Sequence, residues 1–203
     1  MPIVRRRVTD ARDLKVLAHP LRLALLETVV TEGPLTASRA AGLLGESPSN
    51  CSWHLRKLAE HGFVREAPGG TGRNRPWRAV AQGLDWGEPE DGAADPDAGI
   101  AAEALSDLLV EREVQRLRAA RASRDAEPTA WQEVTGLLSS MAWLTAAEAA
   151  TLRGQLIDVL TPHLERSAQR SAHAEDRPED ARLVSLVGWL VPAGPPRARG
   201  VAP

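Results

Sequence analysis

A stop signal and a start signal for helices lie three residues apart in the first quarter of this chain. Gly45 follows a run with helical periodicity, and glycine readily adopts the left-handed conformation that ends a helix. Ser47-Pro48 opens the next run, because serine caps helix N-termini and proline is tolerated at the first helical position. The sequence therefore predicts two short helices, over about 37–44 and 48–61, joined by a tight turn.

Two further helices are predicted before this pair. Asp10 can cap a short helix that ends before His19, and Pro20 suits the first position of a second helix. Apolar residues at helical spacing follow Pro20, and this helix stops at Gly33. Thr36 can then cap the helix over 37–44.

A β-hairpin is predicted directly after the helices. Two short extended runs, 63–67 and 76–80, flank a glycine-rich segment that contains Arg73 and Arg75. Helices, a tight turn and then a basic hairpin are the order of a winged helix-turn-helix. We therefore expect such a domain over residues 10–80.

Charge is divided unevenly along the chain, although the formal net charge is −2. Residues 1–80 carry 13 Lys/Arg against 7 Asp/Glu, whereas residues 81–203 carry 12 against 20. A basic half followed by an acidic half indicates a nucleic-acid-binding module with a separate partner region. Chance clustering of charge is the alternative. The run Arg5-Arg6-Arg7 predicts either a basic arm or a disordered, solubilising terminus.

Residues 10–80 resemble the DNA-binding domain of ArsR-type bacterial transcriptional regulators. The resemblance covers just over a third of the chain and is carried by four segments at the expected distances from one another: Ala18-His19-Pro20-Leu21-Arg22, Ala40-Ala41-Gly42-Leu43-Leu44-Gly45, Ser52-Trp53-His54-Leu55-Arg56-Lys57-Leu58 and His61-Gly62-Phe63-Val64. It implies double-stranded DNA as a partner and a homodimer.

The helix over 48–61 is the candidate recognition helix, because its polar residues lie away from the apolar face of Cys51, Leu55 and Leu58. Asparagine can make a bidentate pair with adenine, while hydroxyl and basic side chains hold phosphates. Arginines at a hairpin tip suit the minor groove or flanking phosphates. The predicted DNA-binding residues are Ser47, Ser49, Asn50, Ser52, Trp53, His54, Arg56, Lys57, Arg73, Asn74 and Arg75.

Two of these residues have structural alternatives. Trp53 could pack on a thymine methyl or a sugar, or instead contact the wing or another helix. His54 matches a histidine that is usual in the family resembled, where a structural or backbone contact is commoner than base reading.

No metal centre, cofactor or enzyme is predicted. The thiolate sites of ArsR-type sensors need at least two clustered cysteines, and this chain has Cys51 alone, on an inward face where it suits a small buried hydrophobe. Their other type of zinc site needs histidines on the long dimer helix, and residues 98–124 contain none. The chain also lacks the Gly-x-Ser-x-Gly and His-Glu-x-x-His motifs.

Beyond the hairpin, residues 81–97 have the acidic, Gly- and Pro-rich composition of a linker, and residues 98–124 read as one long helix. Its apolar residues lie on two faces in successive segments, and such a helix usually touches two bodies. The resemblance implies that it pairs with its mate about a twofold axis; packing wholly within one chain is the alternative. The predicted dimerisation residues are Leu105, Leu108, Leu109, Val110, Val114 and Leu117.

Residues 125–191 are expected to form a small α+β domain, followed by a disordered tail over 192–203. Thr145 to Glu148 forms a capping box that opens a helix, which Pro162 kinks or restarts. The runs 131–144 and 183–191 are expected to be strands that pair and cover this helix. Two sets of residues are expected inward: Ala149, Leu152, Leu156, Val159 and Leu160 on the helix, and Trp131, Trp143 and Trp189, as core or around a ligand pocket.

The sequence as a whole predicts an α+β fold that is mainly α. We expect a cytoplasmic bacterial protein without a membrane segment or secretory signal, acting as a DNA-binding regulator. A repressor on a palindromic operator is favoured, and a winged-helix protein–protein interaction module is the alternative. The sequence identifies no small-molecule effector, although it is compatible with one.

Overall fold

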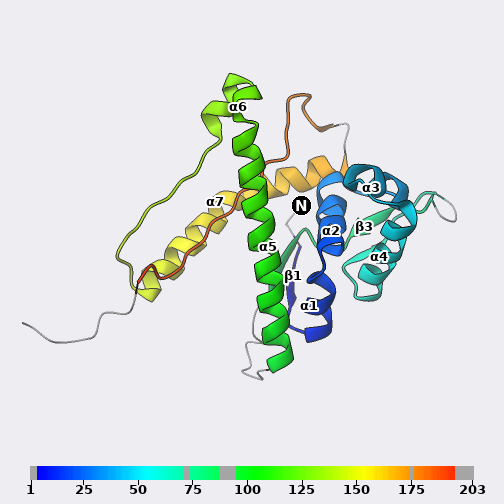
Figure 1. Cartoon of the computed structure of the whole chain (residues 1–203), viewed down its shortest axis with the longest axis horizontal. Coiled ribbons are helices and arrows are strands. Elements are labelled where there is room, and N and C mark those ends of the chain that lie inside the picture. The colour runs from blue at the N-terminus through cyan, green and yellow to red at the C-terminus, as the bar shows by residue number, and fades with distance from the viewer. Residues whose placement is uncertain (1–3, 71–73, 87–94, 174–175, 195–203) are drawn as a thin grey trace, which may run out of the picture.

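The computed structural model describes residues 4–70, 74–86, 95–173 and 176–194. The fold is mainly α with two small two-stranded sheets, which confirms the expected class. The elements in chain order (Figure 1) are β1 (Arg5–Val8), α1 (Ala11–Leu17), α2 (Pro20–Glu32), α3 (Ala37–Leu44), α4 (Pro48–Glu60), β2 (Val64–Glu66), β3 (Trp77–Ala79), β4 (Gly83–Trp86), α5 (Pro96–Ala122), a 3-10 turn η2 (Arg124–Ala126), α6 (Thr129–Val134) and α7 (Ala146–Ala172).

Helix starts and the α3–α4 turn are where the sequence predicts them. The side chains of Asp10, Thr36 and Ser47 accept hydrogen bonds from backbone N–H groups in the first turns of α1, α3 and α4. Pro20 occupies the first position of α2. Gly45 ends α3 with φ 68°, the left-handed conformation that favours glycine.

One hydrophobic core joins α1–α4, the wing strands β2 and β3, and the first half of α5. Leu14, Leu25, Leu55, Leu58 and Phe63 are among its fully buried side chains. The wing strands are antiparallel, as predicted, with Val64 opposite Ala79. The isolated bridge between Leu35 and Trp77 ties β3 back to the segment before α3.

A second sheet, between β1 and β4, corrects two expectations. Arg5–Val8 is neither a free arm nor a disordered terminus, because it pairs in parallel with Gly83–Trp86. Residues 83–86 accordingly belong to the domain and not to a linker. The physical reason is packing: Val8 is buried, and Leu84 and Trp86 pack against the core. The middle of the expected linker, residues 87–94, lies outside the described residues.

The long helix predicted over 98–124 is present as α5, which begins at Pro96 with Asp95 as its cap. Its first half packs against α1, with Ala98, Ala101 and Leu105 buried. Farther along, Arg112 and Arg116 each reach the carboxylate of Glu27 on α2 over 2.5 Å. The helix thus belongs in part to the winged domain.

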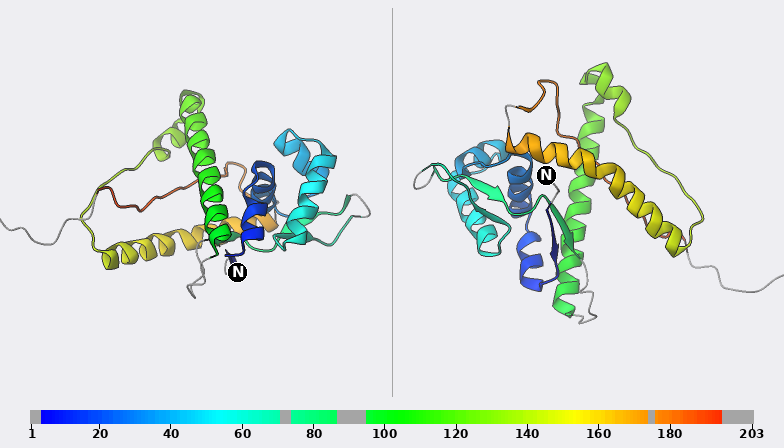
Figure 2. Two further views of the ribbon diagram at one scale, coloured as in Figure 1. Left: turned by 60° about the horizontal axis from the view of Figure 1, so that its bottom comes forward. Right: turned by 180° about the vertical axis from the view of Figure 1, so that it is seen from behind.

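The predicted strands of the C-terminal region are absent from the described residues 95–173 and 176–194. Residues 129–134 instead form α6, and 183–191 run in extended form without a strand partner (Figures 1 and 2). Short apolar runs do not by themselves distinguish strands from helices, and for this reason the prediction of strands over 131–144 and 183–191 was wrong. Side-chain contacts hold the extended run instead, since Ser185 donates to Glu113 over 2.7 Å and Arg182 pairs with Glu127.

The prediction of a core within the C-terminal region is also wrong. Trp143 and Trp189 are 85% and 63% exposed, and Trp131 is half-buried beneath the guanidinium of Arg182. Most of the helix residues expected inward, such as Leu156, are exposed, because α7 projects away from the winged domain (Figure 2). The capping box at Thr145 and Glu148 is confirmed.

The helix α7 continues through Pro162 where the sequence predicts a kink or a restart. Its last turn meets the C-terminal end of α2. Ser171 is buried there and donates to the backbone carbonyl of Thr31 over 2.7 Å, and Arg177 donates to the same carbonyl over 2.9 Å. Of the described helices, none combines the length and the apolar character that crossing a membrane requires.

Candidate nucleic-acid interface

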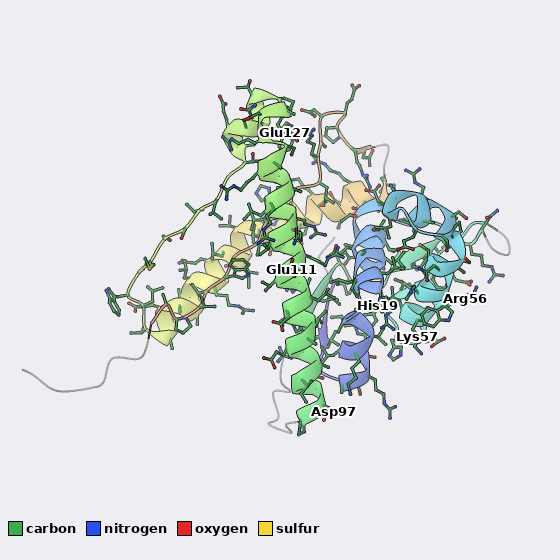
Figure 3. All side chains as sticks on the ribbon, viewed as in Figure 1. His19, Arg56, Lys57, Asp97, Glu111 and Glu127 are labelled. Atoms are coloured by element: carbon green, nitrogen blue, oxygen red, sulfur yellow. The ribbon has the colours of Figure 1, made fainter. Side chains whose placement is uncertain are left out.

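The helix α4 presents two faces. Cys51, Leu55 and Leu58 are fully buried in the core, and the residues predicted to read DNA lie mostly on the opposite side. Ser47, Ser49, Asn50, Trp53 and Arg56 are exposed, while Ser52 and Lys57 are half-buried. Arg56 and Lys57 extend from α4 on the side of the domain away from α5 (Figure 3).

The start of α4 is organised by short-range hydrogen bonds. Ser47 Oγ caps the helix by accepting from Asn50 N over 3.2 Å, and it also lies 3.2 Å from Ser49 Oγ. The side chain of Asn50 is engaged as well, since its Nδ2 donates to Glu46 Oε2 over 3.1 Å. The predicted base-reading amide is thus exposed and held by an acidic neighbour.

Two basic side chains lie along the middle and end of α4. Arg56 donates to Ser52 Oγ over 2.9 Å, a neutral partner that leaves its charge uncompensated in this contact. Lys57 forms an exposed ion pair with Glu60 over 2.9 Å. Exposed pairs of this kind contribute little to stability, so a phosphate could replace Glu60 at small cost.

Trp53 and His54 differ sharply in their accessibility. The indole of Trp53 is 58% exposed and meets the imidazole of His54 edge-on, with 4.7 Å between ring centroids. His54 is only 6% exposed. The structure therefore leaves Trp53 able to contact a groove, and it gives His54 a largely internal position.

The wing holds the other predicted contacts. Asn74 and Arg75 are exposed, and Arg75 is paired with Glu66 over 2.7 Å. Arg73 lies outside the described residues.

Sequence reasoning missed two further arginines on the wing. Arg65 and Arg78 are directly opposite each other in the β2–β3 register, and both are exposed. The alternation that buries Val64 implies that Arg65 points outward, and that signal was available in the sequence.

A hollow of about 480 Å³ lies between the start of α2 and the start of α4. Its described lining residues are His19, Pro20, Leu21, Ala24, Leu44, Glu46, Asn50 and His54. The rings of His19 and His54 lie 4.7 Å apart between centroids, and the Nδ1 atoms of both are buried without a hydrogen-bond partner among the described residues. The hollow is continuous with the exposed part of α4 through Asn50.

The two imidazoles are held in their neutral forms. Burial lowers the pKa of His19, and the nearby guanidinium of Arg22 lowers it further. Burial also lowers the pKa of His54, followed by the effects of His19 and Arg22, while Glu46 opposes the shift. At neutral pH the pair can therefore each offer one N–H and one acceptor nitrogen.

Cys51 is the free cysteine of the chain and is fully buried in the core. Burial raises the pKa of its thiol, and the carboxylate of Glu46 adds to that shift. Within the described parts of the chain, no group of three or more His, Cys, Asp or Glu side chains could hold a metal ion.

The residues predicted for dimerisation divide into two groups. Leu105 is 1% exposed inside its own chain, so it does not lie on a surface that a second chain could contact. Leu109 packs on the same core, whereas Val110 and Leu117 are exposed and Leu108 and Val114 are half-buried. The outward-facing group therefore keeps the prediction of a homodimer open.

Residues 17–67 match the family model of a helix-turn-helix domain. The match spans α2, α3, α4 and β2, the part of the chain in which the turn at Gly45 and the exposed face of α4 lie. None of the curated proteins compared with the chain matches it. Fold and family match together define a helix-turn-helix domain of the winged type, a class of DNA-binding regulatory domain. The finer resemblance to ArsR-type regulators stays a prediction.

Proposed function

We propose that this chain is a sequence-specific transcriptional regulator that binds a palindromic operator as a homodimer and represses by occlusion. The observation that carries the proposal is the exposed face of α4. It combines an amide at Asn50, hydroxyls at its first turn and basic side chains at Arg56 and Lys57 on a helix whose other face is fixed in the core.

The division of charge supports the same proposal. The winged half of the chain is basic although the whole chain is slightly acidic, and the exposed wing arginines Arg65 and Arg78 add to the local positive charge. Phosphate contacts from such residues supply most of the affinity for any duplex, while Asn50 and its neighbours supply selectivity.

The homodimer is proposed through the outward stripe of α5, which includes Val110 and Leu117. A twofold axis beside α5 would present two copies of α4 to successive turns of one face of a duplex, and that arrangement requires a palindromic site. Residues 125–191 take no part in the proposed dimer surface, and a small-molecule effector that binds there is compatible with the proposal.

Selection of bound sequences from a random duplex pool by the purified protein, with and without a chelator, tests the proposal. The expected result is a palindrome, and an affinity for it that falls steeply as salt rises. Recovery of no enriched sequence, together with an affinity that salt does not change, would contradict DNA binding and favour an interaction module. A strictly monomeric mass from light scattering, free and on the selected duplex, would contradict the dimer.

Double replacement of Val110 and Leu117 by aspartate tests the dimer surface separately. The expected result is a monomer that keeps cooperative unfolding, because both side chains are exposed in the single chain. The matched control is Val159→Asp on α7, which is 66% exposed and lies outside the proposed interface.

A further inference from the structure

The N-terminus of α2 borders the hollow beside α4 and has backbone N–H groups that no intrahelical hydrogen bond uses. His19 occupies the cap position of this 13-residue helix without making a side-chain capping bond, and the first turn contains no acidic residue. Pro20 has no N–H, and the first intrahelical bond is donated by Leu23 N to the carbonyl of His19. The N–H groups of Leu21 and Arg22 therefore precede the helix ladder, where partial positive charge accumulates.

The second observation is the buried histidine on the opposite wall. His54 lines the hollow and is only 6% exposed. Its Nδ1 atom has no hydrogen-bond partner among the described residues. His19 lines the same hollow from α2, in ring contact with His54. The first turn of α2 and two largely neutral imidazoles thus border one space.

Charge around the hollow favours an anion from one side and opposes it from the other. Arg22, in the first turn of α2, forms no ion pair with any described residue; its one hydrogen bond there is a long one, of 3.5 Å, to the carbonyl of Lys15. Glu46 is the one carboxylate among the described lining residues, and it accepts a hydrogen bond from Asn50 Nδ2. A contact that engaged Asn50 elsewhere would free Glu46 to turn away.

We propose that the hollow between α2 and α4 holds a phosphate of the DNA backbone, bound by the N-terminus of α2 together with His19 and His54. The inference rests on the proposed function and adds to it a contact from α2, outside the helix-turn-helix pair itself. Its position beside Asn50 places the phosphate next to the base-reading residues and so fixes the depth at which α4 enters the groove. Helix N-termini are established anion sites because N–H groups and the helix dipole both point at the ligand.

An isosteric pair of substitutions isolates the charge at this position. His19→Asn and His19→Asp both give α2 a side-chain cap of the same shape, and only the second adds a negative charge where the phosphate would bind. We expect the Asp variant to bind the selected duplex about tenfold more weakly than the Asn variant, since one added like charge is worth about that ratio. Urea unfolding should show the Asp variant at least as stable as the Asn variant.

The control pair is Ala147→Asn and Ala147→Asp, in the exposed first turn of α7. Both should bind the duplex equally. A methylphosphonate scan of the duplex then locates the contact: one neutral substitution should weaken binding to the wild-type chain and strengthen binding to the His19→Asp variant, because it removes the repulsion there.

Two results would overturn the inference. Equal duplex affinities for the His19→Asp and His19→Asn variants would show that no phosphate binds in the hollow. Binding of the same duplex by the wild-type chain would show that the proposed function still stands. If inorganic phosphate alone at millimolar concentration shifts the imidazole NMR signals of His19 and His54 as the duplex does, the site takes a free anion instead. If the wild-type chain binds no duplex, the proposed function fails, and this inference fails with it.

Discussion

The hydroxyl of Ser171 donates to the backbone carbonyl of Thr31 over 2.7 Å and so attaches the last turn of α7 to the end of α2 across 140 positions of sequence. Arg177 reinforces the contact, reaching the same carbonyl and the carboxylate of Glu32. This junction is where the C-terminal half, otherwise projecting from the winged domain, is attached to the segment that leads into α3.

Gly33 sits against this junction and should tolerate no side chain. Its φ is 77°, and a Cβ there would lie 1.9 Å from the carbonyl oxygen of Ser171. We expect Gly33→Ala to lower the free energy of unfolding by about 1–2 kcal/mol and to speed amide exchange in the last turn of α7. Urea unfolding and hydrogen exchange measure the two effects.

Gly154→Ala is the matched control for that substitution. Gly154 lies inside α7 with nothing within 4 Å of its Cβ position, so alanine should stabilise the helix by about 0.5–1 kcal/mol. Equal effects at the two positions would mean that the Ser171 junction does not form in solution.

The amide of Asn50 should control sequence selectivity and contribute little to general DNA affinity. With Asn50→Ala we expect discrimination at one base pair of each half-site to fall by about 1–3 kcal/mol, because a bidentate contact with adenine is lost. Affinity for an unrelated duplex should change little. Competition with singly substituted duplexes measures this, with Gln155→Ala on exposed α7 as the control. Uniform weakening at all sequences would instead make Asn50 a phosphate contact.

Acid should weaken the fold within a defined pH window through the His19–His54 pair. Both pKa values are lowered, mainly by burial, so the unfolded chain takes up these protons first as the pH falls. The stability that the two neutral imidazoles contribute is fully present above the unfolded pKa of about 6.5. It declines as the pH falls from there through the folded pKa values. Urea unfolding at pH 7.5 and 5.5 checks the sign, and His19→Asn combined with His54→Gln should flatten the difference.

Carboxylates do not obscure that test. The pKa values of Glu60 and Asp97 are lowered, chiefly by hydrogen bonds from Lys57 and Lys15, so their contribution is lost only well below the histidine window. A dependence on pH that persisted in the double variant would show that other groups are responsible.

The thiol of Cys51 should react slowly in the folded protein. It is fully buried, and burial raises its pKa, so both access and thiolate are scarce. A chromogenic disulfide reagent should label Cys51 rapidly in urea and slowly, at the rate of opening, in native buffer. Fast labelling of the native chain would contradict its placement in the core.

The local parts of the fold were predictable because their signals are local. Thr36, Gly45 and Ser47 each act within one turn of helix, so the α3–α4 arrangement and the face of α4 follow from a few neighbouring residues. The β1–β4 pair was not predictable in this way, because Arg5 meets Gly83 across most of the winged domain and the alternation of Leu84 and Trp86 is too short to indicate a strand.

The C-terminal half resisted prediction for a different reason. The apolar residues around Trp143 and Trp189 have the composition of buried strands, but burial needs a partner surface, and both side chains stay largely exposed. The candidate site shows the same division. The exposed face of α4 was predicted from the helical spacing of its apolar residues. The hollow beside His19 could not be predicted in this way, because it depends on how α2 and α4 pack against each other.

The bond from Asn50 to Glu46 gives the free protein a resting state in which the base-reading amide is already satisfied. A duplex with adenine in the right place replaces that bond with two of its own, and a wrong base pair removes it without replacement. The resting bond is therefore a cost that every duplex engaging Asn50 has to offset, and it lowers affinity without changing the ratio between matched and mismatched duplexes. Weakening it with Glu46→Ala should make binding to both kinds of duplex tighter by a similar factor.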